Sequence, residues 1–565
     1  MEWEKASFER RDVLKIGALG ALGVAGLAVP LGTRAQTRTP STLSARNFPA
    51  PYAAAFRRPK ILKPYGETVD ETGRTMLYSV TAMETNVNLV PGLATKVWAY
   101  NGLAPGPTIS VDQHDQVKLR VRNALPTTHP LFGHPFSTST HLHGSASLPQ
   151  FDGYANDLTH VGEVKEYTYP DYQGGRTLWY HDHAMHHTAE NVYTGLAAQY
   201  HLHDSYELGQ LPQGEFDVPL IVSDAMFAAD GSLAFNDRSH KSLWGDIIFV
   251  NQVAWPVMNV KRRVYRFRIL NASISRSYRF ALSTGDPLTV VGTDGGMVPV
   301  PQPVASFRHG TAERYEVLID FSKYAVGTKI DLINLSNPNN VTYSNTGKVM
   351  RFTVTGDAFD GTNNVMPTAL DISPQGLDTM GLTTAMSART TKLTVLHNDT
   401  TNVWSINGKT WDDVVASGFR STVANPQINE VQLWEIENKS GGWFHPVHIH
   451  LVDFKVVSRK KDAAAATGPF AWECGPKDVI YVGEGEKVQL LMRFSVAAGS
   501  TGGRYMIHCH NLVHEDHDMM QQYRVGNNDP DNDPNDPIYA ALPSFDDQPP
   551  DFQDAQYEPA YPLGT

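Results

Sequence analysis

The sequence predicts an all-β protein with three consecutive β-sandwich domains, on three observations. Short runs of alternating or compact apolar residues recur along the chain, as in QVKLRVRNALP, RRVYRFRILNAS and EKVQLLMRFSV, and Gly, Pro or Asn bounds each run. One strand–turn–strand frame occurs three times. The length of 565 residues exceeds what one hydrophobic core usually organises. We expect the strands to pair as antiparallel sandwiches.

The repeated frame leads from an Asn turn to a strand that ends in Asn. Its first two copies are YNGLAPGPTISVDQHDQVKLRVRNALP and VNQVAWPVMNVKRRVYRFRILNAS, each with a Pro-containing step. A third version is INGKTWDD, followed by NEVQLWEIENKS. Three spaced copies indicate three related domains. We place them at residues 45–206, 207–357 and 390–527, with a polar linker at 358–389.

The N-terminus carries Arg10 and Arg11 before a Gly-rich apolar run from Ile16 to Leu31. That run is too short and too weakly hydrophobic for a comfortable membrane span. Residues 1–35 therefore resemble a twin-arginine signal peptide with cleavage after Ala35, and the alternative is an uncleaved anchor. We expect export to the periplasm, the cell surface or the medium, and no stable membrane span.

The C-terminal segment 528–565 is an acidic, Pro-rich tail, which is typical of a solvated terminal arm that wraps the surface; an interaction or calcium-binding tail is the alternative. The net charge of −12 gives no basic surface for nucleic acid. Cys474 and Cys509 are the only cysteines, too few for a disulfide framework. We interpret Cys474 as a small packed residue.

Thirteen of the 22 histidines lie in four short stretches, HLHG, HDHAMHH, HPVHIH and HCHNLVHEDH. Each stretch contains a His-x-His unit, and residues i and i+2 of a strand face the same side. Neutral imidazole suits copper and zinc, and four such pairs exceed the needs of one structural zinc. Two pairs lie in the first domain and two in the last, so we expect several metal ions at the interface between these domains, which the middle domain spaces. Isolated histidines such as His129 are expected at the surface or in the core.

The HCH unit predicts two different metal sites on one strand. His508 and His510 point one way and Cys509 points the other. With His445, His514 and Met519, the thiolate completes a His, His, Cys and weak Met set, which is that of a blue copper. One strand would then join an electron-accepting copper to a multinuclear group.

These four motifs, in this order across the mature chain, resemble those of three-domain multicopper oxidases, and the neighbouring residues are most similar to the bilirubin oxidase and bacterial spore-coat laccase branch. The resemblance implies three cupredoxin-like Greek-key β-sandwich domains and four copper ions: one type 1, one type 2 and a type 3 pair. It assigns His445, Cys509, His514 and Met519 to type 1, and His141 with His448 to type 2. The type 3 ligands would be His143, His181, His183, His450, His508 and His510, and their division between two coppers stays open.

Several residues within or beside the four motifs have alternative interpretations. His186, His187 and His517 have no place in the family's ligand pattern, so we interpret them as surrounding or surface residues. The ten-residue spacing from Cys509 matches the family at Met519 rather than Met520. Asp152 and Glu515 are carboxylates beside the motifs. By the resemblance they deliver protons, and otherwise Asp152 shapes a turn and Glu515 orients a ligand.

The predicted function is oxidation of an organic reductant, one electron at a time, coupled to reduction of dioxygen to water. Phenols, aromatic amines and tetrapyrroles such as bilirubin are the implied substrates, and we expect a monomer. The first rival is a metallo-oxidase acting on Cu(I) or Mn(II), but the 15 methionines are scattered rather than gathered in an insertion. The second is a non-enzymatic cupredoxin scaffold, which would be expected to lack some of the twelve ligands.

Overall fold

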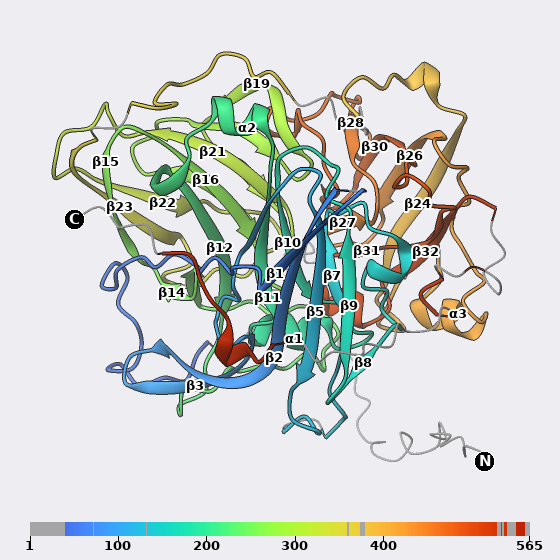
Figure 1. The fold of residues 1–565 in the computed structure, drawn as a ribbon, viewed down its shortest axis with the longest axis horizontal. Helices are drawn as coiled ribbons and strands as arrows, with labels where there is room; N and C mark the ends of the chain where they lie inside the picture. The colour runs from blue at the N-terminus through green and yellow to red at the C-terminus, as the bar shows by residue number, and fades with distance from the viewer. Residues whose placement is uncertain are drawn as a thin grey trace, which may run out of the picture. The chain divides into compact units, whose positions relative to one another are not determined.

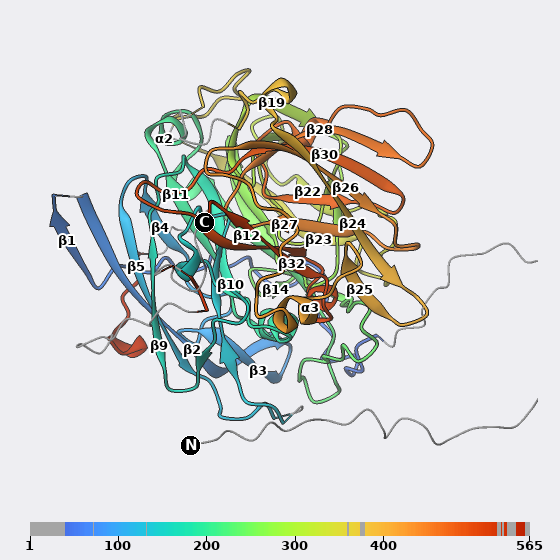
Figure 2. The same ribbon diagram turned by 90° about the vertical axis from the view of Figure 1, so that its right-hand side faces the viewer.

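The computed structural model describes residues 40–71, 73–130, 133–358, 361–372 and 379–527, and residues 533, 536–538 and 550–559 of the tail. The predicted signal peptide lies outside these residues. The described strands form six larger sheets that follow one another in pairs along the chain (Figure 1 and, turned by 90°, Figure 2). We refer to them as the first, middle and last sheet pairs.

The first sheet pair spans residues 66–203. One sheet has the order β1-β2-β5-β9 with β3 on β2, and the other β4-β11-β10-β7. Their bounds are β1 Gly66–Asp70, β2 Gly73–Val90, β3 Leu93–Tyr100, β4 Ile109–Asp112, β5 Gln116–Ala124, β7 Thr140–His143, β9 Val164–Tyr169, β10 Arg176–Asp182 and β11 Ala197–His203. A small ribbon of β6 (Ser137–Thr138) and β8 (Thr159–His160), the turn η1 (Pro149–Phe151) and helices α1 (Thr188–Thr194) and α2 (Ser205–Gln210) complete this part.

The middle sheet pair spans residues 217–357 and follows the turn η2 (Gly214–Phe216). Its sheets have the orders β14-β13-β12-β16-β21-β18-β19 and β15-β23-β22-β17-β20. Their bounds are β12 Asp217–Ala225, β13 Ile247–Val250, β14 Val253–Ala254, β15 Val257–Arg262, β16 Val264–Asn271, β17 Tyr278–Leu282, β18 Leu288–Thr293, β19 Gly296–Val304, β20 Phe307–His309, β21 Arg314–Asp320, β22 Lys329–Asn334 and β23 Lys348–Asp357.

The last sheet pair spans residues 389–525, with the orders β25-β24-β26-β30-β28 and β29-β27-β31-β32. Its bounds are β24 Arg389–Asn398, β25 Val403–Ile406, β26 Val431–Asn438, β27 His445–Ile449, β28 Phe454–Lys461, β29 Val479–Val482, β30 Glu486–Arg493, β31 Gly503–Cys509 and β32 Met520–Val525. The other elements are α3 Trp411–Ala416, α4 Leu512–Asp516, η3 Thr384–Met386, η4 Ala471–Glu473 and, in the tail, η6 Phe552–Asp554.

The three copies of the repeated frame have the same local geometry. Asn101, Asn251 and Asn407 all adopt a positive φ, between 49° and 55°. Each side-chain oxygen accepts a hydrogen bond of 2.8 Å from a backbone N–H of the first long strand of its sheet pair. Asn tolerates the left-handed region better than most residues and can bond to backbone at the same time. The repeat in the sequence is therefore a repeated turn.

The expectation of purely antiparallel pairing is wrong, because each sheet pair contains parallel neighbours. Strands β2 and β5, β12 and β16, and β24 and β26 run parallel, at equivalent places in the three pairs. Alternation of apolar residues reports which face of a strand is buried and carries no information on the direction of its neighbour. The alternation pattern therefore supported the sandwiches but not their pairing.

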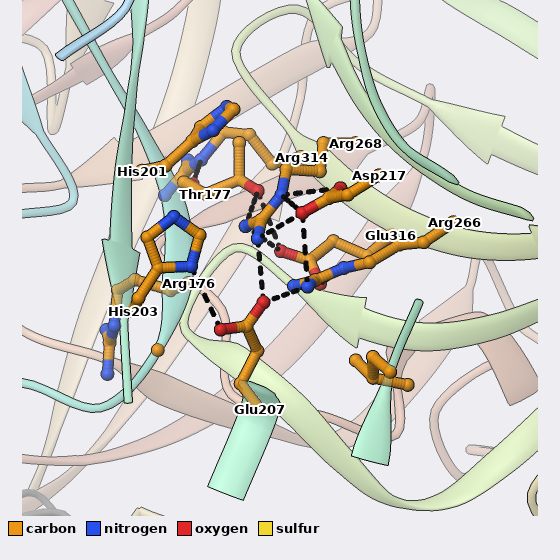
Figure 3. A network of polar contacts seen from close by, with 12 residues as sticks. Arg176, Thr177, His201, His203, Glu207, Asp217, Arg266, Arg268, Arg314 and Glu316 are labelled. Atoms are coloured by element: carbon orange, nitrogen blue, oxygen red, sulfur yellow. Dashed lines mark hydrogen bonds and ion pairs between the residues drawn. The ribbon is translucent and has the colours of Figure 1, made fainter. Parts of the chain in front are cut away.

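A buried charge network joins the first sheet pair to the middle one (Figure 3). Glu207 of α2 forms ion pairs with Arg266 and with Arg268, the latter at 2.8 Å, and all three side chains are fully buried. Thr177 of β10 adds a hydrogen bond of 2.7 Å to Glu316. Buried charges stay stable only when they are paired and hydrogen-bonded, so this network specifies how α2 and β10 meet β16 and β21.

The described tail residues contact the body of the protein. Asp536 forms a buried ion pair of 2.7 Å with Arg504, and Tyr557 bridges to Leu62. At these points the tail is held against the body by specific contacts. Among the described residues, no helix is long and apolar enough to cross a membrane.

Candidate metal centre

Four strands bring the histidine motifs together where the first and last sheet pairs meet. In Figure 1, β7 and β10 lie beside β27 and β31. Strands β7 and β10 are antiparallel and place His181 opposite His141, while β27 and β31 place His448 opposite His508. Opposite residues of an antiparallel pair project to the same face. The register thus aims both pairs of imidazoles into one buried interface.

The eight histidines of this interface, here called the imidazole cluster, form three groups whose donor atoms lie within 4.8 Å of one another. The groups are His141, His143 and His448; His143, His181 and His510; and His183, His450 and His508. Each group draws from both the first and the last sheet pair. The grouping also divides the six histidines of the expected type 3 pair, whose division the sequence left open, into two sets of three. One set is His143, His181 and His510, and the other is His183, His450 and His508.

Most imidazoles of the cluster turn one nitrogen outward to the protein and the other inward. His181 Nδ1 donates to the carbonyl of Asp182 at 2.7 Å, and His448 Nδ1 donates to the carbonyl of Asp478 at 2.9 Å. The opposite nitrogens, Nε2 of both rings and Nε2 of His141, are buried and have no protein hydrogen bond. A fixed outer hydrogen bond with a bare inner nitrogen is the arrangement of metal-binding histidines.

The protonation states of the cluster also fit a metal. Burial, followed by mutual repulsion, holds the pKa of His141 well below its usual value and lowers that of His181 to about 3. For His183, burial outweighs the attraction of Glu515 and lowers the pKa to about 4. These rings are neutral at neutral pH, and a neutral imidazole is the form that binds a transition metal. Buried lone pairs without partners are costly, and metal ions would satisfy them.

Cys509, His445 and His514, here called the thiolate group, lie on the opposite side of β31. His445 Nδ1 is 3.3 Å from Cys509 Sγ, His514 Nδ1 is 3.7 Å from that sulfur, and the two nitrogens are 3.4 Å apart. Nitrogen and sulfur bind transition metals at about 2.0–2.3 Å, so donors in a trigonal plane lie about 3.5–3.8 Å apart. The three donors are close to that size. Burial raises the pKa of the thiol, and a bound metal removes that proton.

The packing favours Met519 over Met520 as the fourth residue of the thiolate group. Met519 is fully buried in the same hydrophobic cluster as Cys509, and its carbonyl accepts the Cys509 N–H at 3.0 Å. Met520 packs in a separate cluster with Trp411 and Met506. Met520 begins β32 opposite His508, so its side chain lies on the His508 side of β31 and away from Cys509.

Both predicted carboxylates contact outer nitrogens of the imidazole cluster. Asp152 Oδ2 accepts from His450 Nδ1 at 2.8 Å. Glu515 Oε2 lies 2.7 Å from His508 Nδ1, and Oε1 lies 3.6 Å from His183 Nδ1. Burial raises the pKa of Asp152 well above its usual value. Both carboxyl groups therefore contact the same histidine group, that of His183, His450 and His508.

Asp478 is a supporting residue that the sequence reasoning missed. Its carboxylate accepts from His143 Nε2 at 3.0 Å and pairs with Arg314 of β21, while its carbonyl holds His448. A β carbon at Gly144 would lie 2.5 Å from Arg314 Nη2 and 2.7 Å from Asp478 Oδ2. The glycine of the HLHG motif thus leaves room for this ion pair. Nothing in the local sequence GPKDVIY marks Asp478 as a partner of histidines 30 and more residues away.

A stack of aromatic rings covers the thiolate group. The ring of Trp404 lies 3.6 Å from that of His514, and His397 stacks on the other side at 3.9 Å. Trp443, which is partly exposed, meets His514 edge-on at 5.3 Å and stacks on Trp244 at 6.3 Å. These rings come from three separate segments, so the sequence pattern could not bring them together.

The three histidines of the motifs that were not assigned as ligands, His186, His187 and His517, have partners outside the two donor sets. His186 Nδ1 contacts the carbonyl of Asp516 at 2.8 Å. His517 pairs with Asp237 at 3.1 Å and stacks on His240. His187 belongs to a different cluster, with Glu190.

Cys474 and Cys509 are both free cysteines.

Three family models described as multicopper oxidase match the chain, over residues 81–205, 179–348 and 385–529. The bilirubin oxidase of Albifimbria verrucaria is 40% identical over 75% of this chain and 72% of its own length. The laccase of Bacillus subtilis (strain 168) is 34% identical over 83% of this chain and 97% of its own. The crystal structure of the multicopper oxidase McoA from Aquifex aeolicus superposes with a TM-score of 0.69, 27% identity, and coverage of 84% of this chain and 100% of that one.

We expect Gly144→Ala to lower the metal content of the purified protein. The added methyl group displaces the Arg314–Asp478 pair and with it the hydrogen bonds to His143 and His448. Gly162→Ala is the matched control, because Gly162 also has a positive φ of 91° but no atom within 4 Å of the added carbon. Elemental analysis of both variants measures the effect. Equal metal loss in the two would trace it to backbone strain and contradict the proposed clash.

Proposed function

We propose that this chain, which belongs to the multicopper oxidase family, removes single electrons from an organic reductant and passes four of them to dioxygen, which leaves as water. The observation that carries the proposal is the adjacency of two donor sets on β31. Cys509 points toward His445 and His514, while its immediate neighbours His508 and His510 point toward the other histidines of the imidazole cluster. We assign one copper to the thiolate group and three to the imidazole cluster.

Copper bound to these residues would supply reversible one-electron chemistry and a place for dioxygen. The protein's own contribution is geometry and exclusion of water. All eight imidazoles and the thiolate group are buried. His141, His181 and His448 are held in one tautomer by backbone carbonyls that accept their outer N–H. Preset donors need no rearrangement when the charge of the site changes.

The aromatic cover of the thiolate group supports an organic reductant. Trp443 offers a partly exposed indole ring beside His514, and Trp404 lies stacked on the same histidine. A phenol or a tetrapyrrole has a flat face that stacks on such a ring, whereas a metal ion does not. The rival metallo-oxidase activity on Cu(I) or Mn(II) would instead need ligands at this entrance.

We propose that Asp152 and Glu515 transfer protons to the dioxygen side, and their contacts with the imidazole cluster support this role. Each carboxylate lies outside the histidine group of His183, His450 and His508, within 2.8 Å of an imidazole nitrogen. Reduction of dioxygen to water consumes four protons, which must reach a buried site through donors in hydrogen-bond contact or through water. A ligand-orienting role is the alternative for both residues.

We also propose export by the twin-arginine route to the periplasm, the cell surface or the medium. The support is Arg10 and Arg11 before a short apolar run. A protein whose metal centre joins its first and last sheet pairs assembles that centre only after folding, which is consistent with export in the folded state.

Cys509→Ser is expected to abolish the blue absorption and nearly all turnover while the fold is retained. The absorption arises from the bond between copper and thiolate, and serine cannot replace it. Cys474→Ser is the control, since Cys474 is the only other cysteine. Visible spectra and copper analysis of both variants are compared with the wild type. A blue Cys509→Ser protein, or a wild type that is colourless when oxidised and fully loaded, would refute the copper assignment.

A reductant screen tests the substrate class. We expect the copper-loaded protein to oxidise bilirubin or a dimethoxyphenol with a higher kcat/KM than Cu(I) or Mn(II). Trp443→Ala should raise the KM for the organic reductant by about 2- to 10-fold, the value of one lost aromatic stack. Trp472→Ala, which changes a partly exposed tryptophan on η4, should not. A preference for Cu(I) or Mn(II) over every organic reductant would favour the metallo-oxidase.

Glu515→Gln separates proton delivery from electron entry. The amide keeps nearly the same shape but loses the titratable group. Anaerobic reduction of the blue copper should stay close to the wild-type rate, and reoxidation by dioxygen should slow by about 100-fold. Asp152→Asn should act in the same direction. Stopped-flow measurement of the two half-reactions, reduction of the blue copper and reoxidation by dioxygen, distinguishes these two roles of Glu515. Slow reduction with normal reoxidation would place Glu515 on the electron-entry side.

A further inference from the structure

Four metal-binding side chains that the multicopper centre does not use gather beside α1. They are His129, His134, His187 and Glu190. His129 and His134 come from the segment between β5 and β6, His187 is the residue before α1, and Glu190 lies in its first turn. No pattern in the sequence joins them, since His129 is isolated there and His187 has no place in the family's ligand pattern.

Glu190 is the centre of this group. Its Oε1 lies 2.9 Å from His134 Nε2 and 3.1 Å from His187 Nδ1, and its Oε2 lies 3.6 Å from His129 Nε2. Donor atoms of His129, His134 and Glu190 all lie within 4.8 Å of one another.

The chain fixes these side chains before any ligand arrives. The backbone N–H of His129 donates to the carbonyl of His134 at 2.8 Å, which holds the two ends of their segment together. The ring of His134 stacks on that of His187 at 4.0 Å. The ring of His129 packs edge-on against Trp98 at 4.8 Å. Such supporting contacts are what a built site has and a chance encounter of surface histidines lacks.

Ion pairing alone explains the group poorly. One carboxylate faces three imidazoles, and it can balance only one positive charge. Glu190 and His129 are buried, with 5% and 3% of their surface exposed, so further protonated rings there repel one another at low screening. A divalent cation bound among them would replace these contacts, because each ring would release the proton on the nitrogen that faces Glu190, and the rings and the carboxylate would then bind one shared charge.

We propose that His129, His134, His187 and Glu190 form a binding site for one divalent transition-metal ion, separate from the multicopper centre. Three imidazoles and one carboxylate are a nitrogen-rich, four-donor set that suits zinc and its neighbours better than calcium or magnesium. His134 and His187 are partly exposed, with side-chain exposures of 23% and 27%, so an ion can enter from solvent.

The ion would tie His129 and His134 to α1, next to the catalytic part of the protein. The N–H groups of Thr188 and Ala189 donate to the Asp516 carboxylate at 2.9 and 2.7 Å. Asp516 closes helix α4, which also carries His514 and Glu515. A metal ion here stabilises the native state by mass action, since the four donors are assembled only in the folded chain.

The test uses the copper-loaded full-length protein, so that the copper sites are filled. It is incubated with zinc, desalted and analysed for both metals. We expect the wild type and the control His160→Ala, which changes an exposed histidine outside the group, to retain one additional zinc per chain. The double variant His134→Ala/His187→Ala should lose it while keeping its copper and its blue absorption. Zinc should raise the thermal midpoint of the first two proteins only.

If the double variant also loses its copper, it has not folded, and Glu190→Gln replaces it, because the amide keeps the shape of Glu190 and removes its charge. Retention of as much zinc by the variants as by the wild type would overturn the proposal. So would a wild type that retains none, which would leave the group as a set of hydrogen-bonded ion pairs.

Discussion

The alternation of side chains along β31 is the constraint on which the rest of the site depends. His508 and His510 face one side and Cys509 faces the other, because a strand repeats every two residues. A shift of one residue in the pairing of β31 with β27 would exchange these faces. The register that sets His448 opposite His508 and Val447 opposite Cys509 therefore decides which metal each side chain can reach. Both neighbouring strands, β27 and β32, fix that register.

The charged residues around the buried imidazole cluster need partners, because an unpaired buried charge is costly. Arg314 holds Asp478, and Asp478 in turn holds the outer nitrogens of His143 and His448. Arg314 belongs to the middle sheet pair, so this part does more than space the other two. It supplies a cation at the back of the imidazole cluster, anchored by the same strand β21 whose Glu316 enters the buried network of Figure 3. Burial raises the pKa of the Asp478 carboxyl, and Arg314 opposes that rise and so favours the ionised form.

The sequence predicted the features that depend on local spacing. Alternation predicted β-sandwiches, and the three Asn turns predicted the repeat, which Asn101, Asn251 and Asn407 share down to the same hydrogen bond. The His-x-His units predicted which rings share a face. Features set by tertiary contact were out of reach: the parallel pairing of β2 with β5, the role of Asp478, and the stack of His397 and Trp404 on His514. None of these leaves a periodic signal in the chain.

The two kinds of histidine site show why spacing alone is an incomplete guide to metal binding. Metal ligands on a strand can be recognised in the sequence, because residues two apart share a face. The group of His129, His134, His187 and Glu190 has no such pattern, since two residues between β5 and β6 and the start of a helix supply its donors. It was assembled by backbone bonds and ring stacking, contacts that only the fold reveals. Histidines with no periodic partner therefore need to be judged by what surrounds them in the structure, and here three of them share one buried carboxylate.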